Sequence, residues 1–173
     1  MNDETLRYPI GRFQSPACFT AAGRGAAIQT LREAPVQMRE LTARLSEPEL
    51  ERRYRPDGWT IRQVAHHVPD SHLNAYVRMK LALTEDAPTV KAYDEAAWAR
   101  LPDSAAPVAA SLDLLDALHR RWVALLESLT EAQFRCALRH SEMGLMSLDQ
   151  VLALYAWHSR HHLAHVRAAL MAA

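Results

Sequence analysis

Cysteine is scarce in this sequence, and long hydrophobic runs are absent. Only two of the 173 residues are cysteine, Cys18 and Cys136, and they form no CxxC pair. A cysteine-based zinc or iron–sulfur site is therefore excluded. No segment reaches the run of about 18 apolar residues that a membrane span requires, and residues 1–13 lack the apolar core of a signal peptide. We therefore expect a cytoplasmic protein with reduced thiols.

An excess of charge of either sign is also lacking. The sequence has 20 basic and 20 acidic residues, and no basic block stands out. Nucleic acid is therefore not an expected partner. No internal repeat and no glycine-rich phosphate loop is present. With 49% hydrophobic residues, the chain suits one domain over residues 1–173 with a substantial core.

The clearest pattern lies near the C-terminus, from Leu148 to His165. Alternating steps of three and four residues define one seam of a helix, and the first half of that seam is apolar. In the second half, histidine stands where leucine would be expected. The residues of the seam are Leu148, Val151, Tyr155, His158, His162, His165 and Ala169.

The histidines of this seam predict a metal site. His158 and His162 are four residues apart, so their rings lie on adjacent turns of one face. A single core histidine usually bonds a carbonyl group, but each unpartnered buried imidazole costs roughly 1–3 kcal/mol. A shared metal ion removes that cost. His161 and His165 are also four apart, but His161 lies off the seam, about 60° round the helix from His158.

Three further segments show helical periodicity with similar seams. They span residues 22–45, 60–83 and 107–129. Capping boxes at Thr60–Gln63 and Ser147–Gln150 mark the starts of the second helix and of the histidine helix. Together the four segments predict an all-α fold, a four-helix bundle with a metal site between helices. Pro35 is expected to kink or split the first helix, and Pro69 to bend the second.

The remaining segments connect these helices. Residues 1–20 are expected to form an extended arm. Residues 84–106 form a crossover that is longer than an ordinary helix connection. In it, Tyr93, Asp94 and Trp98 are expected either to anchor the crossover or to line a cleft. Residues 136–146 contain Gly144 and suit a small hairpin.

A third metal ligand must come from another helix. His67 lies at the edge of the inward stripe of the second helix, and it is the natural third ligand. His66 and His72 point elsewhere, and we expect them at the surface or beside a ligand. His119 lies one step off the seam of the third helix and is expected to be partly exposed.

These residues belong to segments that resemble one family throughout. The segments are RYPIGRF at 7–13, GWTIRQVAHHVPDSHLNAYVRMKLALTE at 58–85, YDEAAW at 93–98 and LYAWHSRHHLAHV at 154–166. The chain resembles the DinB/YfiT-like metalloproteins, most closely the YfiT, or bacillithiol S-transferase, branch. The resemblance places the metal ligands on His67, His158 and His162. These are the same three histidines that the helical spacing predicts. It also implies a homodimer.

Three imidazoles without a carboxylate or thiolate leave coordination positions open, which is the catalytic pattern. One divalent ion per chain is expected, with zinc the first choice and nickel, manganese or iron also suited to three histidines. The resemblance implies a thiol S-transferase, in which a low-molecular-weight thiol such as bacillithiol attacks a small electrophile in detoxification.

Two alternatives remain open at this point. One is a metal-dependent hydrolase with a hydroxide nucleophile, for which Asp70, one turn past His67, is the nearest general base by spacing. His161, beside the ligand pair, is a second residue that would assist the site. The other alternative is a non-enzymatic metal-binding stress protein.

Overall fold

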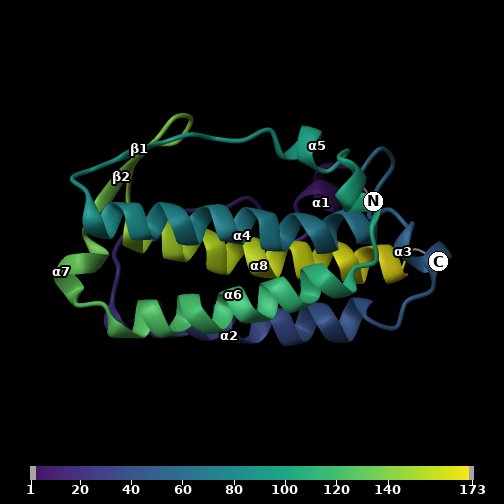
Figure 1. Ribbon diagram of the computed structural model, residues 1–173, viewed down its shortest axis with the longest axis horizontal. Helices are drawn as coiled ribbons and strands as arrows, with labels where there is room; N and C mark the ends of the chain where they lie inside the picture. The colour runs from purple at the N-terminus through teal and green to yellow at the C-terminus, as the bar shows by residue number, and fades with distance from the viewer. Residues whose placement is uncertain (1–2, 172–173) are drawn as a thin grey trace.

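Four long helices run side by side and form a bundle (Figure 1). The computed structural model describes residues 3–171. The four helices are α2 (Ala21–Thr42), α4 (Ile61–Thr84), α6 (Ala109–Ser128) and α8 (Leu148–Met171). Each helix packs against two neighbours, in the order α2, α6, α4, α8 around the bundle. The predicted four-helix bundle is confirmed, including the long crossover between α4 and α6.

Side-chain caps fix the starts of the two helices that carry the histidine motifs. Thr60 Oγ1 accepts a hydrogen bond from the Gln63 N–H at 3.1 Å, and Gln63 Oε1 accepts one from the Thr60 N–H at 3.0 Å. Ser147 and Gln150 make the same reciprocal pair before α8. Each cap contributes about 0.5–2 kcal/mol. Both predicted capping boxes are confirmed.

Two prolines lie inside unbroken helices. Helix α2 continues through Pro35 and α4 continues through Pro69. Of the two effects expected of Pro35, a kink or a split, the split is excluded. An interior proline costs about 3 kcal/mol, but both prolines are buried and the turns around them pack against neighbouring helices. This packing offsets the lost backbone hydrogen bonds.

The bundle interior contains two hydrophobic clusters with a polar zone between them. The first cluster includes Trp122 and the apolar residues at the start of α8. The second includes Leu115 and the apolar residues near the end of α8, from Leu163 onward. The middle of α8 carries the histidines, and it crosses the gap between these clusters. Burial of hydrophobic surface on both sides holds the polar middle in place.

A small sheet lies beside one end of the bundle (Figure 1). Strand β1 (Thr89–Val90) pairs in parallel with β2 (Ala137–His140), and β2 pairs antiparallel with β3 (Gly144–Ser147). The predicted hairpin is thus confirmed, and Gly144 has the positive φ of 73° that its turn requires. Pairing with β2 ties the crossover to the bundle before it continues through α5 (Glu95–Trp98) and the 3₁₀ turn η1 (Pro102–Ala105).

The N-terminal arm is only partly extended. It begins with the short helix α1 (Asp3–Arg7), so the expectation of an extended arm was wrong for these residues. Residues 1 and 2 of the arm, and residues 172 and 173 of the expected domain, lie outside the described residues. Beyond α1 the arm lies along α8, where Trp157 Nε1 donates to the Gly11 carbonyl oxygen at 3.2 Å. The arm therefore covers the helix face that carries the histidines.

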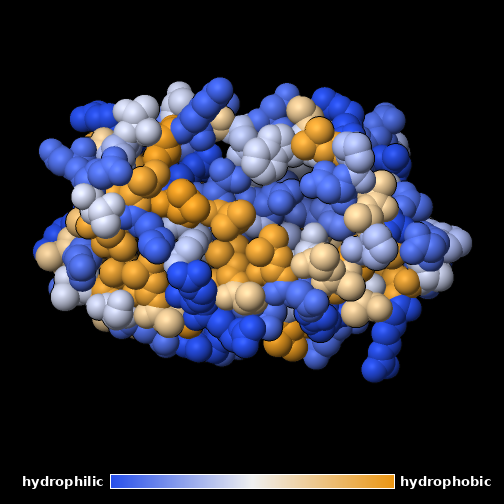
Figure 2. All heavy atoms as spheres, in the orientation of Figure 1, coloured by the Kyte–Doolittle hydropathy of each residue, from blue (hydrophilic) through white to orange (hydrophobic). Residues whose placement is uncertain are grey.

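The two remaining short helices, α3 (Glu47–Leu50) and α7 (Glu131–Phe134), lie near opposite ends of the bundle (Figure 1). Figure 2 shows hydrophobic side chains at the surface over the line of α4 and α6. Leu73 and Val77 of α4 and Leu114 of α6 are among the exposed large hydrophobic residues. Among the helices of residues 3–171, none combines the length and the hydropathy that a membrane crossing needs.

Candidate metal centre

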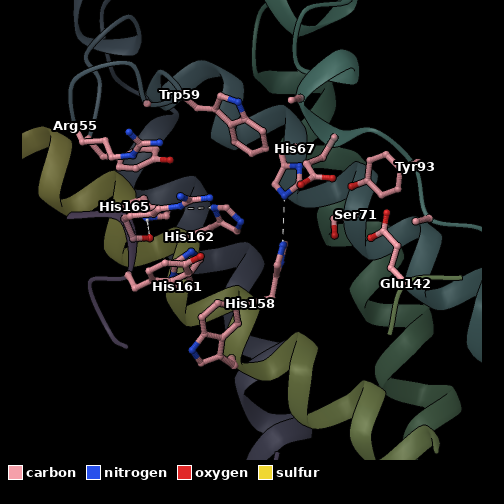
Figure 3. A pocket seen from close by; sticks show the side chains of 18 of the residues that line it. Arg55, Trp59, His67, Ser71, Tyr93, Glu142, His158, His161, His162 and His165 are labelled. Atoms are coloured by element: carbon pink, nitrogen blue, oxygen red, sulfur yellow. Dashed lines mark hydrogen bonds between the residues drawn. The ribbon is translucent and has the colours of Figure 1, made fainter. Parts of the chain in front are cut away.

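The three predicted ligands meet where α4 packs against α8 (Figure 3). His67 comes from α4, while His158 and His162 lie on adjacent turns of α8. One ring nitrogen of each histidine lies within 4.8 Å of those of the other two. The closest pair is His67 Nε2 and His158 Nε2, at 3.3 Å. The fold therefore brings together the trio expected from the sequence.

A cavity of about 450 Å³ opens onto the trio. Trp59 forms part of its wall, and its ring centroid lies 4.5 Å from that of His67. The cavity lining also has several charged side chains, three of them basic. These are Arg7, Arg55, Arg78, Asp57, Glu95 and Glu142. The volume suits a small organic molecule rather than a polymer.

Burial keeps the three imidazoles neutral. Removal from water, and then repulsion from His165, together lower the pKa of His67 to about 4. Burial, and then the nearby imidazoles, lower the pKa values of His158 and His162 well below the ordinary value. A neutral imidazole has one nitrogen lone pair to offer a metal ion. All three ligands are therefore in the state that binds metal at pH 7.

The Nδ1 atoms of the two α8 ligands already have partners. His158 Nδ1 lies 3.0 Å from His72 Nε2, and His162 Nδ1 lies 3.4 Å from His165 Nδ1. The Nε2 atoms of His158 and His162 are therefore the ring nitrogens that can bind a shared metal ion. Three neutral imidazoles converging on one point fit a divalent cation, because a cation is what their lone pairs can share.

Comparison with known proteins matches residues 30–166 to the DinB superfamily. The chain belongs to the DinB superfamily. A relative from Halalkalibacterium halodurans is 46% identical over 165 residues, which cover 95% of this chain and 96% of the relative. A relative from Bacillus mycoides is 47% identical and covers 93% of each chain. Both are named "putative metal-dependent hydrolase".

A solved structure has the same fold as this DinB protein. YfiT from Bacillus subtilis aligns with a TM-score of 0.91 and 41% identity, over 94% of each chain. Its description calls YfiT "a probable metal-dependent hydrolase with an unusual four-helix bundle topology". The predicted resemblance to YfiT is therefore confirmed at the level of family and fold.

Other histidines of this DinB protein lie deeper than the sequence suggested. His119 was expected to be partly exposed, but only 1% of its surface is accessible. Helix α6 is covered by both α2 and α4, so its inward face is wider than a single seam. His72 is fully buried and bonds to His158, which places it beside a ligand. His66 is buried as well, and its ring nitrogens face Ser111 Oγ at 2.7 Å and the Ala106 carbonyl oxygen at 2.9 Å.

Asp70 does not reach the cavity. It is not among the described residues that line the cavity. Burial, and then repulsion from Asp103, raise its pKa. The carboxylates that line the cavity are those of Asp57, Glu95 and Glu142. Sequence reasoning missed all three. They lie on the segments that connect the long helices, and helical periodicity does not show which of these segments lies near α8.

Of the three crossover residues expected to anchor the segment or line a cleft, only Tyr93 lines the cavity, beside Ala92, Glu95 and Ala96. Tyr93 lines the cavity, where burial raises the pKa of its hydroxyl. Asp94 instead caps α5, since its Oδ1 accepts a hydrogen bond from the Ala97 N–H at 2.7 Å. Trp98 packs against Tyr93, with ring centroids 4.4 Å apart. Both expected roles of this segment, anchoring and lining, therefore occur, in different residues.

Two buried polar atoms beside the trio have no hydrogen-bond partner within residues 3–171. They are Nδ1 of His161 and Nε of Arg55, and both residues line the cavity. The His161 ring stacks on Trp157 with centroids 4.4 Å apart. A buried donor without a partner costs about 1–3 kcal/mol. A bound molecule with an acceptor oxygen would remove that cost at Arg55 Nε, which is always a donor.

Proposed function

We propose that this DinB protein is a metal-dependent enzyme in which His67, His158 and His162 hold one divalent cation. The observation that carries this proposal is the convergence of three neutral imidazole nitrogens within 4.8 Å on the wall of an open cavity. The trio contains no carboxylate or thiolate, so a bound cation would keep its charge and open positions. Zinc is the first choice, with nickel, manganese and iron as alternatives.

Among the reactions of such a site, we favour S-transfer from a low-molecular-weight thiol to a small electrophile. A bound divalent cation would supply Lewis acidity that lowers the pKa of a thiol within its reach. The thiol would release its proton to solvent, its sulfur would form a bond to the electrophilic carbon, and the leaving group would depart with the electrons of the bond that breaks. Neither Cys18 nor Cys136 lines the cavity, so the thiol must come from a co-substrate.

The cavity has three arginines and three carboxylates, and the arginines are the groups that would hold a thiol that carries carboxylates. Arg7, Arg55 and Arg78 all line the cavity, and arginine holds carboxylate oxygens in a fixed fork geometry. Arg55 has an unpartnered Nε there. The family resemblance points to bacillithiol as the thiol. Trp59 and Trp157 line the same cavity, and their rings would exclude water from the reacting groups.

Hydrolysis is the second candidate, because the relatives are named as metal-dependent hydrolases. It needs a base that takes a proton from water. Asp70 lies outside the cavity lining, so this role would fall to Glu95 or Glu142. A non-enzymatic metal-binding role leaves the cavity unexplained.

An assay on metal-loaded protein separates these functions. Protein mixed with bacillithiol and a chromogenic alkylating reagent should form the S-conjugate faster than the uncatalysed reaction, and the His158→Ala variant should not. The same preparations are then tested on ester and amide substrates without thiol. Cleavage of those substrates without any S-conjugation would replace the transferase with the hydrolase. Metal binding without either activity would leave the non-enzymatic role.

The resemblance further implies a homodimer, which we include in the proposal. The hydrophobic side chains exposed on α4, Leu73 and Val77, would support such an assembly. Sedimentation equilibrium on the purified protein tests it directly, and a monomer mass at assay concentration would contradict it.

A further inference from the structure

A chain of three imidazoles leads from the metal centre into the bundle core. His158 Nδ1 lies 3.0 Å from His72 Nε2, and His72 Nδ1 lies 2.8 Å from His119 Nε2. His119 Nδ1 then lies 2.5 Å from the carbonyl oxygen of Leu31. His72 and His119 are almost fully buried, in the polar zone between the two hydrophobic clusters. The chain therefore connects helices α8, α4, α6 and α2 in turn.

The carbonyl group at the core end fixes the direction of every hydrogen bond in this chain. A carbonyl oxygen can only accept, so His119 Nδ1 must carry a proton and donate. His119 is neutral, because burial lowers its pKa to about 4, so its Nε2 is a lone pair that accepts from His72 Nδ1–H. The Nε2 of neutral His72 must then accept from His158 Nδ1–H. His158 is left with a bare lone pair on Nε2.

A second, shorter chain acts on the other α8 ligand in the same way. His165 Nε2 lies 3.1 Å from the carbonyl oxygen of Arg7, so it must donate. His165 Nδ1 is then an acceptor for His162 Nδ1–H, over a longer distance of 3.4 Å. His162 is thereby also left with a bare lone pair on Nε2. Two carbonyl groups, from α2 and from the end of α1, thus specify the same tautomer in both ligands.

We propose that His72, His119 and His165 are positioning residues that lock His158 and His162 in the tautomer that binds metal. This inference rests on the proposed metal site. A neutral histidine in water exchanges between two tautomers, and only one of them presents Nε2 to the ion. The chains remove that choice and orient the rings. Aligned hydrogen bonds also polarise one another and make the ligand nitrogen a stronger donor of electrons.

The longer chain gives the sharper test, because its distances are shorter. In His72→Leu the acceptor for His158 Nδ1–H is lost, and zinc affinity should fall about 10–100-fold. In His72→Gln the carboxamide oxygen can still accept that proton, so affinity should remain near the native value. His119→Phe removes only the outer link and should cost less than His72→Leu. Zinc affinity is measured by competition with a chromogenic chelator, and circular dichroism confirms that each variant folds.

His66→Leu is the matched control. His66 is a buried histidine on the same helix and also bonds a carbonyl oxygen, but its ring nitrogens face Ser111 and Ala106 rather than the trio. Its replacement should lower stability and leave zinc affinity unchanged. Equal losses in His66→Leu and His72→Leu would overturn the positioning role, as would a loss in His72→Gln as large as that in His72→Leu.

The tautomers themselves can be read by nitrogen-15 NMR of the histidine rings in metal-free and zinc-loaded protein. We expect His119, His72 and His158 all as the Nδ1–H form, before and after zinc is added. An Nε2–H form, or a tautomer mixture, at His72 or His119 would overturn this inference while leaving the proposed metal site intact. Native protein that binds no divalent metal would instead overturn the proposed function, and this inference with it.

Discussion

His67 and His158 come from different helices, are 91 residues apart in the sequence, and face each other with their Nε2 atoms 3.3 Å apart. Both imidazoles are neutral because burial lowers their pKa values. Two such nitrogens at this distance need either one proton or one cation between them. The addition of His162 Nε2 favours the cation, because a single proton cannot serve three lone pairs.

Loss of any one ligand should empty the site. His67→Ala, His158→Ala and His162→Ala should each contain little metal after purification, because two imidazoles bind a divalent ion far more weakly than three. His161→Ala should stay largely loaded, since His161 stacks on Trp157 beside the trio. Metal content is measured by elemental analysis. An empty His161→Ala protein together with a loaded His158→Ala protein would show that the ligand pair on α8 is the wrong one.

Removal of the metal should lower stability without unfolding the bundle. An ion that binds only the folded state adds roughly 4 kcal/mol when present at about 1,000 times its dissociation constant. A chelator should therefore lower the melting temperature of native protein, and it should not affect His158→Ala. The helical circular dichroism signal should survive at 25 °C, because two hydrophobic clusters hold the helices together. Complete loss of that signal would indicate a structural metal.

Metal-free protein should lose stability as the pH falls from 6.5 towards 4. The folded-state pKa values of His67, His119 and His165 are lowered to about 4, chiefly by burial. In this window the unfolded chain binds protons that the folded chain does not. Each such histidine therefore lowers the free energy of unfolding by about 1.4 kcal/mol per pH unit. Urea midpoints at pH 7, 6 and 5 measure this effect, and equal midpoints would show that these imidazoles titrate normally.

Replacement of Arg55 should weaken thiol binding more than it slows the reaction. Arg55→Gln removes a cavity-lining cation whose Nε has no protein partner. A hydrogen bond to a charged group contributes about 1.5–3 kcal/mol, so the KM for the thiol should rise roughly tenfold or more. The kcat should change little.

The control for this variant is Arg39→Gln on α2, whose side chain pairs with Asp113 outside the cavity. It should leave both constants unchanged. An unchanged KM in Arg55→Gln would place the thiol elsewhere in the cavity.

Features that depend on one helix could be predicted from the sequence. The spacing of His158 and His162 fixes their angle on α8, and the capping boxes fix where α4 and α8 begin. Local chemistry decides such features, so a local pattern reveals them. The fold and the trio therefore followed from periodicity together with the family resemblance.

Features that depend on which helix lies opposite could not be predicted in this way. His119 lies one step off its own seam, but it faces both Leu31 of α2 and His72 of α4 once the bundle forms. Strand β1 has only two residues, too few to show a period, and its partner β2 follows α6 in the sequence. The imidazole chain and the sheet are consequences of tertiary packing.

The most direct test of the central claim, that a metal held by three histidines binds and activates a thiol, uses cobalt-substituted protein. Addition of bacillithiol at neutral pH should produce a sulfur-to-cobalt charge-transfer band with release of a proton, since metal binding lowers the thiol pKa below about 8.5. The band should be absent from His158→Ala protein. The claim would be contradicted if no thiol changed the spectrum of the cobalt-loaded protein and the same protein cleaved esters or amides. That result would establish the hydrolase.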